Sequence, residues 1–303
     1  MTDKKEAPRQ KSMIGIDLRA LSGVQFCTSP IHFPAFMRSH MSSKETVLIT
    51  GASSGIGLEL AKLFAADGSQ LILAARSADK LQQLAEELNA THGTQSHVIP
   101  VDLAKPEGPG ALMEQIDALG LAVDVLINNA GFGQYGHFAN IPMQRQLEIL
   151  DVNNRALVEL THRVLTGMLE RRSGSILNLG STASFQPGPN SAVYYATKAF
   201  VLSFSEGLWA ETRKQGVCVS CLCPGPTRTG FGADSDMDQT PVFKYNSMRV
   251  EDVAKAGHRA VRKRKRLVIP GWVNWLLAFG TRLPHRRHMI WIMEQLQPPK
   301  KTS

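Results

Sequence analysis

The sequence predicts an α/β protein built on a doubly wound parallel sheet with helices on both faces. From Thr46 onward, short apolar runs alternate with amphipathic stretches. The apolar runs are nearly continuous, which is typical of parallel strands that are buried on both faces. The first run leads through a glycine-rich turn into a helical pattern, so the alternation begins with a strand–turn–helix unit.

The expected elements follow in order along the chain. The run "TVLIT" (46–50) is the first expected strand, and "GLELAKLFAAD" (57–67) is the first expected helix. Ser77 is the expected N-cap of the second helix, because its hydroxyl can accept a hydrogen bond from the first turn. Further strands are expected at 69–75, 97–102, 123–129, 174–180, 216–225 and 266–270, and further helices at 77–90, 109–119, 145–171 and 191–213.

Composition and charge restrict the class of protein. A chain of 303 residues with 43 % hydrophobic residues can bury a large core, which argues against disorder. The net charge of +8 is concentrated near the C-terminus, where residues 251–303 hold 12 Lys/Arg and 3 Asp/Glu. We interpret "RKRKR" (262–266) as a solvated helix end rather than a phosphate-binding or targeting patch. No nucleic-acid-binding motif accompanies it, so we expect no nucleic-acid partner.

The chain divides into three expected parts. Residues 1–41 lack helical or strand periodicity, and we predict that they are a dispensable extension with Met41 as the functional start. Residues 42–270 form the expected catalytic domain, and residues 271–303 a basic amphipathic tail. No run reaches the roughly 18 apolar residues that span a bilayer. We therefore expect a cytoplasmic protein, with membrane association through the tail as the alternative.

The cysteines and histidines do not indicate a metal site. Cys218, Cys221 and Cys223 lie on one expected strand, where Cys221 and Cys223 share a face and Cys218 points to the other. No second pair with zinc-ligand spacing accompanies them, and no histidine pair has the spacing H-E-x-x-H. We expect buried strand cysteines and no metal.

The turn "TGASSGIG" (50–57) indicates a dinucleotide site. Gly51, Gly55 and Gly57 permit a tight turn and the close approach of a diphosphate to the helix N-terminus. A purely structural turn is the alternative for a motif of this kind. Its place in the first strand–turn–helix unit favours the cofactor.

Arg76 favours NADP(H). An NAD site places an acidic residue about 20 residues beyond the glycine turn, where it binds the ribose hydroxyls. Ala75 stands there instead and Arg76 follows, so a 2′-phosphate would meet a guanidinium that can bind it in two-point fashion. Ser77 adds a hydroxyl donor. A surface arginine and a helix cap are the alternative, and NAD(H) remains the second cofactor.

The segment "YYATK" (194–198) contains a candidate acid–base group. Residues four apart share one face of a helix, so Tyr194 and Lys198 are expected neighbours, whereas Tyr195 has Ala199 at that spacing. A nearby ammonium and an oxidised nicotinamide both favour the phenolate and would lower the tyrosine pKa from its usual value near 10. We therefore interpret Tyr194 as the acid–base group and Tyr195 as a packed neighbour.

These motifs occur together with "NNAG" (128–131), "DVN" (151–153), "LGS" (179–181) and "PGPTRT" (224–229), in this order. Over residues 44–270 the sequence resembles the short-chain dehydrogenase/reductase family, whose Rossmann-type domain carries such motifs. The resemblance implies four catalytic residues: Asn153 in a proton relay, Ser181 binding the substrate oxygen, Tyr194 as general acid or base, and Lys198 on the nicotinamide ribose. One departure is Gly180, which stands where a serine is often found.

The resemblance also assigns the cofactor site. Asp102 matches the residue that contacts adenine, and Thr229 matches a threonine that contacts the nicotinamide amide. The full expected set is Gly51, Ser53, Ser54, Gly55, Ile56, Gly57, Arg76, Ser77, Asp102, Asn129, Ala130, Gly131, Tyr194, Lys198, Pro224, Gly225 and Thr229. Asn128 and Asn129 have a structural alternative, because strand-end asparagines often satisfy backbone groups.

The substrate side is read from two segments, 131–138 and 230–248, which border the substrate pocket in this family. Their aromatic residues indicate either an apolar pocket or core packing: Phe132, Tyr135, Phe138, Phe231 and Phe243. The tail at 271–303 has three interpretations, namely a membrane surface, packing against another subunit, or a cover over the pocket. Trp272, Trp275 and the flanking arginines motivate the first.

The sequence therefore predicts an NADP(H)-dependent oxidoreductase that transfers hydride between nicotinamide and an apolar carbonyl/alcohol substrate, such as an acyl, steroid-like or aldehyde compound. We expect a small-molecule substrate and a homo-oligomer, either a dimer or a tetramer. Two alternatives stay open. One is a non-catalytic NADP(H)-binding regulator, and the other is an isomerase or epimerase that uses the cofactor transiently.

Overall fold

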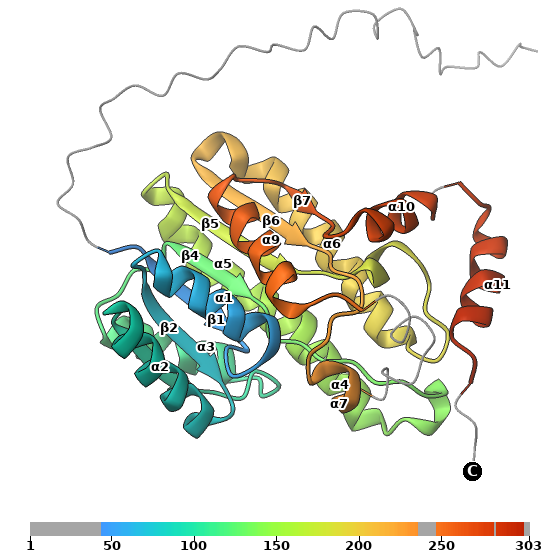
Figure 1. Ribbon diagram of the computed structural model, residues 1–303, viewed down its shortest axis with the longest axis horizontal. Helices are drawn as coiled ribbons and strands as arrows, with labels where there is room; N and C mark the ends of the chain where they lie inside the picture. Colours follow the sequence, from blue (N-terminus) through green and yellow to red (C-terminus); the bar gives the residue numbers. More distant parts are fainter. Residues whose placement is uncertain (1–43, 236–246, 282, 300–303) are drawn as a thin grey trace, which may run out of the picture. The chain divides into compact units, whose positions relative to one another are not determined.

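One sheet of parallel strands organises the protein (Figure 1). The computed structural model describes residues 44–235, 247–281 and 283–299. Within these residues the sheet has seven strands, and the predicted doubly wound fold is confirmed. In spatial order they are β3 (Ser96–Pro100), β2 (Gln70–Ala75), β1 (Thr46–Thr50), β4 (Val125–Asn128), β5 (Gly174–Leu179), β6 (Val217–Leu222) and β7 (Leu267–Val268).

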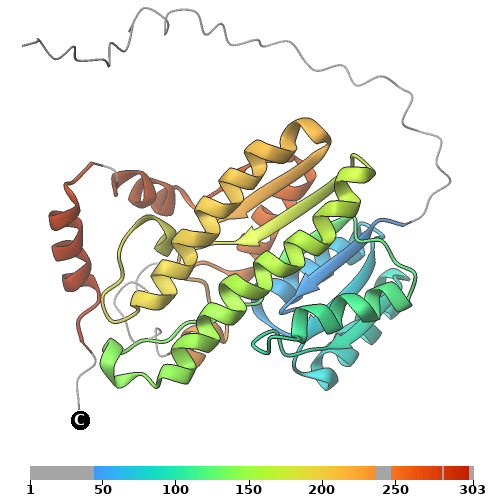
Figure 2. The ribbon, with the colours of Figure 1, turned by 180° about the vertical axis from the view of Figure 1, so that it is seen from behind.

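Helices cover both faces of the sheet, as the apolar strands predict. Helices α1 (Gly55–Ala66), α2 (Ala78–His92) and α9 (Val250–Arg262) pack on one face. Helices α3 (Gly108–Ala118), α5 (Leu157–Glu170) and α6 (Ala192–Thr212) pack on the other, which Figure 2 shows from behind.

Side chains alternate along each strand between these two layers. In β1, Val47 and Ile49 pack with α1, whereas Leu48 packs with α3 and α5. In β6 and just beyond it, Cys221 and Cys223 pack on the α6 side, as the strand periodicity predicts. Both faces of the strands are buried, which explains why their sequences are continuously apolar.

The helical pattern predicted over 145–171 is interrupted in the structure. Helix α4 (Met143–Leu150) passes through a wider π-helical segment, η4 (Asp151–Ala156), before α5 begins. Asn153 lies in this segment, and segments of this kind often occur at functional sites. Ser77 precedes α2 as predicted, but its side chain makes no capping hydrogen bond. The remaining short elements are η3 (Phe138–Asn140), η5 (Thr182–Phe185), η6 (Arg213–Gln215) and α7 (Phe231–Asp234).

The basic run at 262–266 is largely engaged in local pairs. Arg262 bridges Glu45 and Asp67 at 2.7 Å, which ties the end of α9 to the start of β1 and the end of α1. Arg264 donates to the Gly216 carbonyl, and Arg266 pairs with Glu206 at 2.7 Å. These contacts support the interpretation of the run as a helix end.

The tail folds into α10 (Trp272–Gly280) and α11 (Arg286–Leu296), which lie beside the carboxyl ends of the strands (Figure 1). The predictions that residues 1–41 are an extension and that Met41 is the functional start fall outside the described residues. None of the described helices combines the length and apolar character needed to cross a membrane.

Candidate active site

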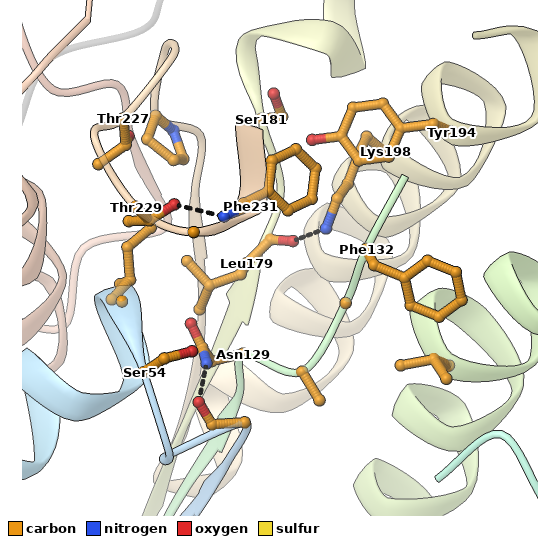
Figure 3. Close-up of a pocket in the computed structure, with 18 of the residues that line it drawn as sticks. Ser54, Asn129, Phe132, Leu179, Ser181, Tyr194, Lys198, Thr227, Thr229 and Phe231 are labelled. Carbon is orange, nitrogen blue, oxygen red and sulfur yellow. Dashed lines mark hydrogen bonds between the residues drawn. The ribbon is translucent and has the colours of Figure 1, made fainter. Parts of the chain in front are cut away.

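The carboxyl ends of the parallel strands open onto one pocket of about 670 Å³ (Figure 3). Connections from β1 and β4 run to opposite sides of the sheet, so a crevice forms where these two neighbouring strands end. Residues that follow each of the strands β1 to β6 line the pocket. Because all the strands run in the same direction, the motifs that follow them lie together at one edge of the sheet, although they are far apart in the sequence.

The glycine turn has a backbone that only glycine accommodates easily. Gly51 and Gly55 adopt φ angles of +66° and +58°. At Gly57 a Cβ atom would lie 2.4 Å from the Gly51 carbonyl oxygen. The turn thus stays tight at the N-terminus of α1, where the first backbone N–H groups favour an anion.

Asn129 and Thr50 hold this turn in place. The Asn129 side chain donates to the carbonyl oxygens of Thr50 at 2.9 Å and Gly51 at 3.1 Å. In return, Thr50 Oγ1 accepts from the backbone N–H groups of Asn129 and Ala130. Asn129 therefore satisfies backbone groups, as the structural interpretation proposed, and also lines the pocket. Asn128 instead bonds Thr161 and Asn178 within the core.

The structure places nearly every predicted site residue on this pocket. Two of them, Gly57 and Asn153, do not line it. Gly57 packs beneath the glycine turn and allows its shape. Those that line the pocket are Gly51, Ser53, Ser54, Gly55, Ile56, Arg76, Ser77, Asp102, Asn129, Ala130, Gly131, Ser181, Tyr194, Lys198, Pro224, Gly225 and Thr229.

Arg76 and Ser77 lie at one end of the pocket, exposed to solvent. The Arg76 guanidinium forms no ion pair or hydrogen bond with another residue of the described segments. Its charge is therefore available to a ligand. Asp102 also lines the pocket, where its Oδ1 accepts from the backbone N–H of Ala104 at 3.0 Å.

Ser181 lies near the hydroxyl end of Tyr194 (Figure 3). It caps η5, and its Oγ accepts from the Ala183 backbone N–H at 3.1 Å. Ser181 also acts to lower the pKa of the Tyr194 phenol, against the larger effect of burial. Because Oγ already accepts from the backbone, its proton is free to be donated to the phenol or to a ligand oxygen.

Tyr194 and Lys198 share one face of α6, as predicted, and both line the pocket while remaining buried. Burial raises the pKa of Tyr194 to about 12, although Ser181 acts in the opposite direction. Lys198 Nζ lies 5.8 Å from the Tyr194 ring centre and donates to the Leu179 carbonyl at 2.8 Å. The prediction that the tyrosine pKa is lowered is therefore wrong for this structure, because burial of the phenol raises it.

Burial acts on the lysine as well. It lowers the pKa of Lys198 to about 8, because the charged ammonium is less stable away from water. At neutral pH the group therefore still carries its proton. Tyr194 also keeps its proton, so the pocket presents a neutral phenol and a buried cation side by side.

Asn153 positions the loop after β4. Its Oδ1 accepts from the Phe132 N–H, and its Nδ2 donates to the Phe132 carbonyl and to Thr197 Oγ1, each at 3.0 Å. A Cβ atom at Gly131 would lie 2.9 Å from Asn153 Oδ1. In this structure the Asn153 amide is engaged with the protein, one layer behind the pocket wall.

The predicted aromatic residues separate into different environments. Phe132 and Phe231 line the pocket, and Tyr135 is buried in a cluster with Tyr194 and Met289. Phe138 fits neither of the two alternatives, pocket or core, because its side chain is 53 % exposed in η3 and does not line the pocket. Phe243 lies outside the described residues.

Sequence reasoning missed part of the pocket wall. Tyr195, interpreted only as a packed neighbour, lines the pocket and accepts a hydrogen bond from Gln297 Nε2. Gln297 and Gln186 line it as well. Gln297 follows Tyr195 by 102 residues, so no local sequence motif predicts their contact.

Packing explains why a glycine rather than a serine stands at position 180 in this chain. A Cβ atom there would lie 2.7 Å from Cys223 Sγ and 3.0 Å from Cys221 Sγ. The two cysteine side chains therefore occupy the space that a serine at 180 would need. No group of acidic, cysteine or histidine side chains in the described segments is arranged to hold a metal ion.

Comparisons with known proteins agree with this geometry. Residues 45–240 match the family model described as short chain dehydrogenase. The Drosophila melanogaster "Dehydrogenase/reductase SDR family protein 7-like" is 35 % identical over 258 residues, which cover 82 % of this chain and 79 % of that protein.

Two solved structures are similar as well. A short-chain dehydrogenase from Sphingobium yanoikuyae in complex with NADPH is 31 % identical with a TM-score of 0.71, over 86 % of this chain and 99 % of that one. The bulky-bulky ketone specific alcohol dehydrogenase from Comamonas testosteroni is 28 % identical with a TM-score of 0.68, over 86 % and 98 %.

The parallel sheet, the glycine turn at its crevice and the family match over most of the chain lead to one assignment. The chain is an oxidoreductase that belongs to the short-chain dehydrogenase/reductase family.

Proposed function

We propose that this protein is an NADP(H)-dependent oxidoreductase that interconverts an apolar ketone or aldehyde and its alcohol, with Tyr194 as the proton donor or acceptor. One observation carries the proposal: Ser181, Tyr194 and Lys198 meet in the pocket that the glycine turn also lines. A hydroxyl pair and a buried cation are thereby placed beside a dinucleotide-type site.

The residues present fit NADP(H). The glycines of the turn have no side chains, so a diphosphate can approach the backbone closely. The backbone N–H groups at Ser54–Ile56 would hold it. The unpaired Arg76 and the adjacent Ser77 would hold the 2′-phosphate. The Sphingobium yanoikuyae relative was solved with NADPH, which supports this cofactor. NAD(H) remains the second candidate, because the diphosphate site does not distinguish the two.

The acid–base chemistry follows from the protonation of the site. The chemistry that NADPH would supply when bound is a hydride for the carbonyl carbon. Tyr194 donates its phenolic proton to the carbonyl oxygen as negative charge develops there, and Ser181 donates a hydrogen bond to the same oxygen. The protonated Lys198 stabilises the resulting phenolate, whose proton returns from solvent. The high pKa of Tyr194 suits this direction, because the group that must give a proton holds one at neutral pH.

The two alternatives are less well supported. A regulator that only senses NADP(H) has no need of a buried phenol paired with a serine and a lysine. The family model that matches the chain is described as short chain dehydrogenase, which favours net oxidation or reduction over an isomerase or epimerase.

The pocket wall supports an apolar substrate. Phe231 packs against Tyr194 with ring centres 5.6 Å apart. Phe132 lines the same pocket. The Comamonas testosteroni relative is named for bulky ketones, which is consistent with such a wall.

We also infer that α10 and α11 contact a membrane surface. Trp272, Trp275 and Trp291 are 76 %, 52 % and 62 % exposed, and Arg286 and Arg287 are exposed at the start of α11. Exposed tryptophans beside arginines suit the headgroup region of an anionic bilayer. Co-sedimentation with vesicles that contain phosphatidylserine tests this, with phosphatidylcholine vesicles as the control. Absence of binding, together with a dimer or tetramer in analytical ultracentrifugation, would assign the surface to a second copy.

The proposed reaction is tested by NADPH and NADH oxidation over a panel of ketones and aldehydes. Replacement of Tyr194 by Phe should lower kcat by roughly a hundredfold to ten-thousandfold while NADPH affinity is unchanged. Tyr195→Phe is the matched control and should retain most of the turnover. Undiminished turnover by Tyr194→Phe would overturn the mechanism.

A further inference from the structure

The inner face of α11 forms part of the pocket region. Met289, Met293 and Gln297 are spaced four residues apart and are the buried positions of this segment, at 9 %, 2 % and 5 % exposure. The two methionines pack in one cluster with Tyr135, Tyr194 and Tyr195. Gln297 itself lines the pocket. The segment is therefore placed against the aromatic side chains that surround the proposed proton donor.

Three polar contacts fix Gln297 and its neighbour Pro298. Gln297 Nε2 donates to the Tyr195 hydroxyl, and Asn190 Nδ2 donates to the Gln297 carbonyl at 2.9 Å. The Tyr135 hydroxyl donates to the Pro298 carbonyl. These partners come from two segments of the chain, one at Tyr135 and one at 190–195. Gln297 is held by its backbone carbonyl and by its amide nitrogen.

The other end of the Gln297 amide has no partner. Its Oε1 is buried and accepts no hydrogen bond from any residue of the described segments. Three further buried side-chain atoms there share this condition, on Ser96, Asn128 and Asn154, and none of those residues lines the pocket. A buried carbonyl oxygen without a donor is unfavourable, and such atoms in native proteins call for an explanation.

We infer that Gln297 Oε1 accepts a hydrogen bond from the substrate, from a hydroxyl or amide N–H away from the reacting carbonyl. This inference rests on the proposed function. The substrate is then an apolar ketone or aldehyde that carries one hydrogen-bond donor. Phe231 gives the pocket an apolar surface, and the polar side chains of Gln186 and Tyr195 line it as well. Among the lining residues, Gln297 holds the buried side-chain acceptor that has no partner in the described segments, so it distinguishes substrates that can donate from those that cannot.

The inference is tested by binding and by turnover with matched probes: benzylacetone, its three ring-hydroxylated isomers and their methyl ethers. Calorimetry with NADP⁺-loaded protein measures affinity, and NADPH oxidation measures kcat/KM. At least one hydroxylated isomer should bind roughly tenfold more tightly than benzylacetone, the difference expected for one buried hydrogen bond. Its methyl ether, which cannot donate, should lose this advantage.

Variants assign the effect to Gln297. Gln297→Leu should abolish the preference for the hydroxylated isomer, and Gln297→Glu, which keeps an acceptor, should retain it. Gln295→Leu makes the same change at an exposed position of α11 and should change nothing. NADP⁺ affinity should be equal in the native protein and all three variants, and the thermal midpoint of Gln297→Leu should equal that of the native protein, which shows that this substitution has not displaced the tail.

Several results would overturn the inference. They are equal affinity for benzylacetone and every hydroxylated isomer, a methyl ether that binds as well as its phenol, a preference that survives Gln297→Leu, or a loss of NADP⁺ affinity in that variant. A hydroxyl preference in calorimetry without turnover would instead contradict the proposed function and leave the role of Gln297 supported.

Discussion

The cofactor side and the substrate side of the pocket are built in different ways. On the cofactor side, each wall is a short contiguous motif at the end of a strand, such as the turn at 50–57 or the segment 128–131. On the substrate side, the wall contains the contact between Tyr195 and Gln297, which are 102 residues apart. A second contact of the tail, between Tyr135 and Pro298, joins residues 163 apart. The first wall depends on backbone shape, whereas the second depends on docking of a tail.

Because of this difference, the cofactor side and the substrate side of the pocket recognise different ligands. A turn defined by glycines and strand ends presents backbone N–H groups, which suit a diphosphate that is the same for every substrate. A wall of side chains from a tail can change without disturbing the sheet, and it contacts the part of the reaction that varies. Changes on the cofactor side should therefore abolish binding, and changes on the substrate side should alter preference.

The largest effect is expected at Gly57. In Gly57→Ala the new Cβ would lie 2.4 Å from the Gly51 carbonyl oxygen, so the turn must open and the backbone N–H groups move away from the diphosphate. We expect NADPH affinity to fall by roughly a thousandfold, equivalent to about 4 kcal/mol. Fluorescence titration with NADPH measures this. An affinity within a few-fold of the native protein would contradict the proposed turn.

The next largest effect concerns stability and pH at Lys198. Its folded pKa of about 8 lies below its ordinary value of 10.5, so burial of the charged form is destabilising at neutral pH. As pH rises from 8 to 10.5 the folded state loses this proton before the unfolded state does, and the folded state becomes relatively more stable. The native protein should gain up to about 3 kcal/mol in free energy of unfolding relative to Lys198→Met across this window.

Urea unfolding of both proteins at neutral pH and at the alkaline end of the window checks the sign. Taking the difference between the two proteins removes the titration of groups that do not interact with Lys198, and Cys221 and Cys223, which do interact with it, are replaced by Ser in both proteins. A stability difference that is independent of pH would mean that Lys198 titrates normally.

Arg76 should set the cofactor preference. In Arg76→Ala the charge that faces the 2′-phosphate is lost, and we expect NADPH affinity to fall roughly tenfold to a hundredfold while NADH affinity stays the same. Lys80→Ala removes an exposed cation one turn further along and serves as the control. Equal losses for both cofactors would refute the assignment of Arg76.

Met293 tests the substrate side alone. Met293→Ala removes buried contact between α11 and the tyrosine cluster, so the tail should dock less firmly. We expect KM for the carbonyl substrate to rise roughly several-fold, with NADPH affinity unchanged. A loss of NADPH affinity of similar size would show that the two sides are not separate.

The smallest effect is expected at Gly207. It lies inside α6 with no atom near the position of a Cβ, and its φ angle is not positive. Gly207→Ala should raise the free energy of unfolding by about 0.5–1 kcal/mol, because alanine loses less backbone entropy in a helix. Denaturant melts measure the gain, and a loss would mean that α6 packs there in a way the structure does not describe.

The sequence predictions were accurate for features that depend on residues close together in the chain, and less accurate for features that depend on distant residues. Strand β1 and the neighbouring glycine turn were predicted because each depends on residues close in sequence. The helix predicted over 145–171 missed the π-helical segment at Asn153, since that segment depends on the Phe132 loop and Thr197. Phe138 was misplaced because an aromatic side chain has no periodicity that distinguishes an exposed turn from a pocket wall.

The sequence by itself determined the parallel sheet, the glycine turn and the pairing of Tyr194 with Lys198, because strand periodicity, positive φ angles and helical spacing are local properties. Only the tertiary structure decided how these groups are protonated and what closes the substrate side. Burial raises the Tyr194 pKa and lowers that of Lys198 through the removal of water, which no spacing encodes. The contact between Tyr195 and Gln297 likewise exists only once the tail returns across the strand ends.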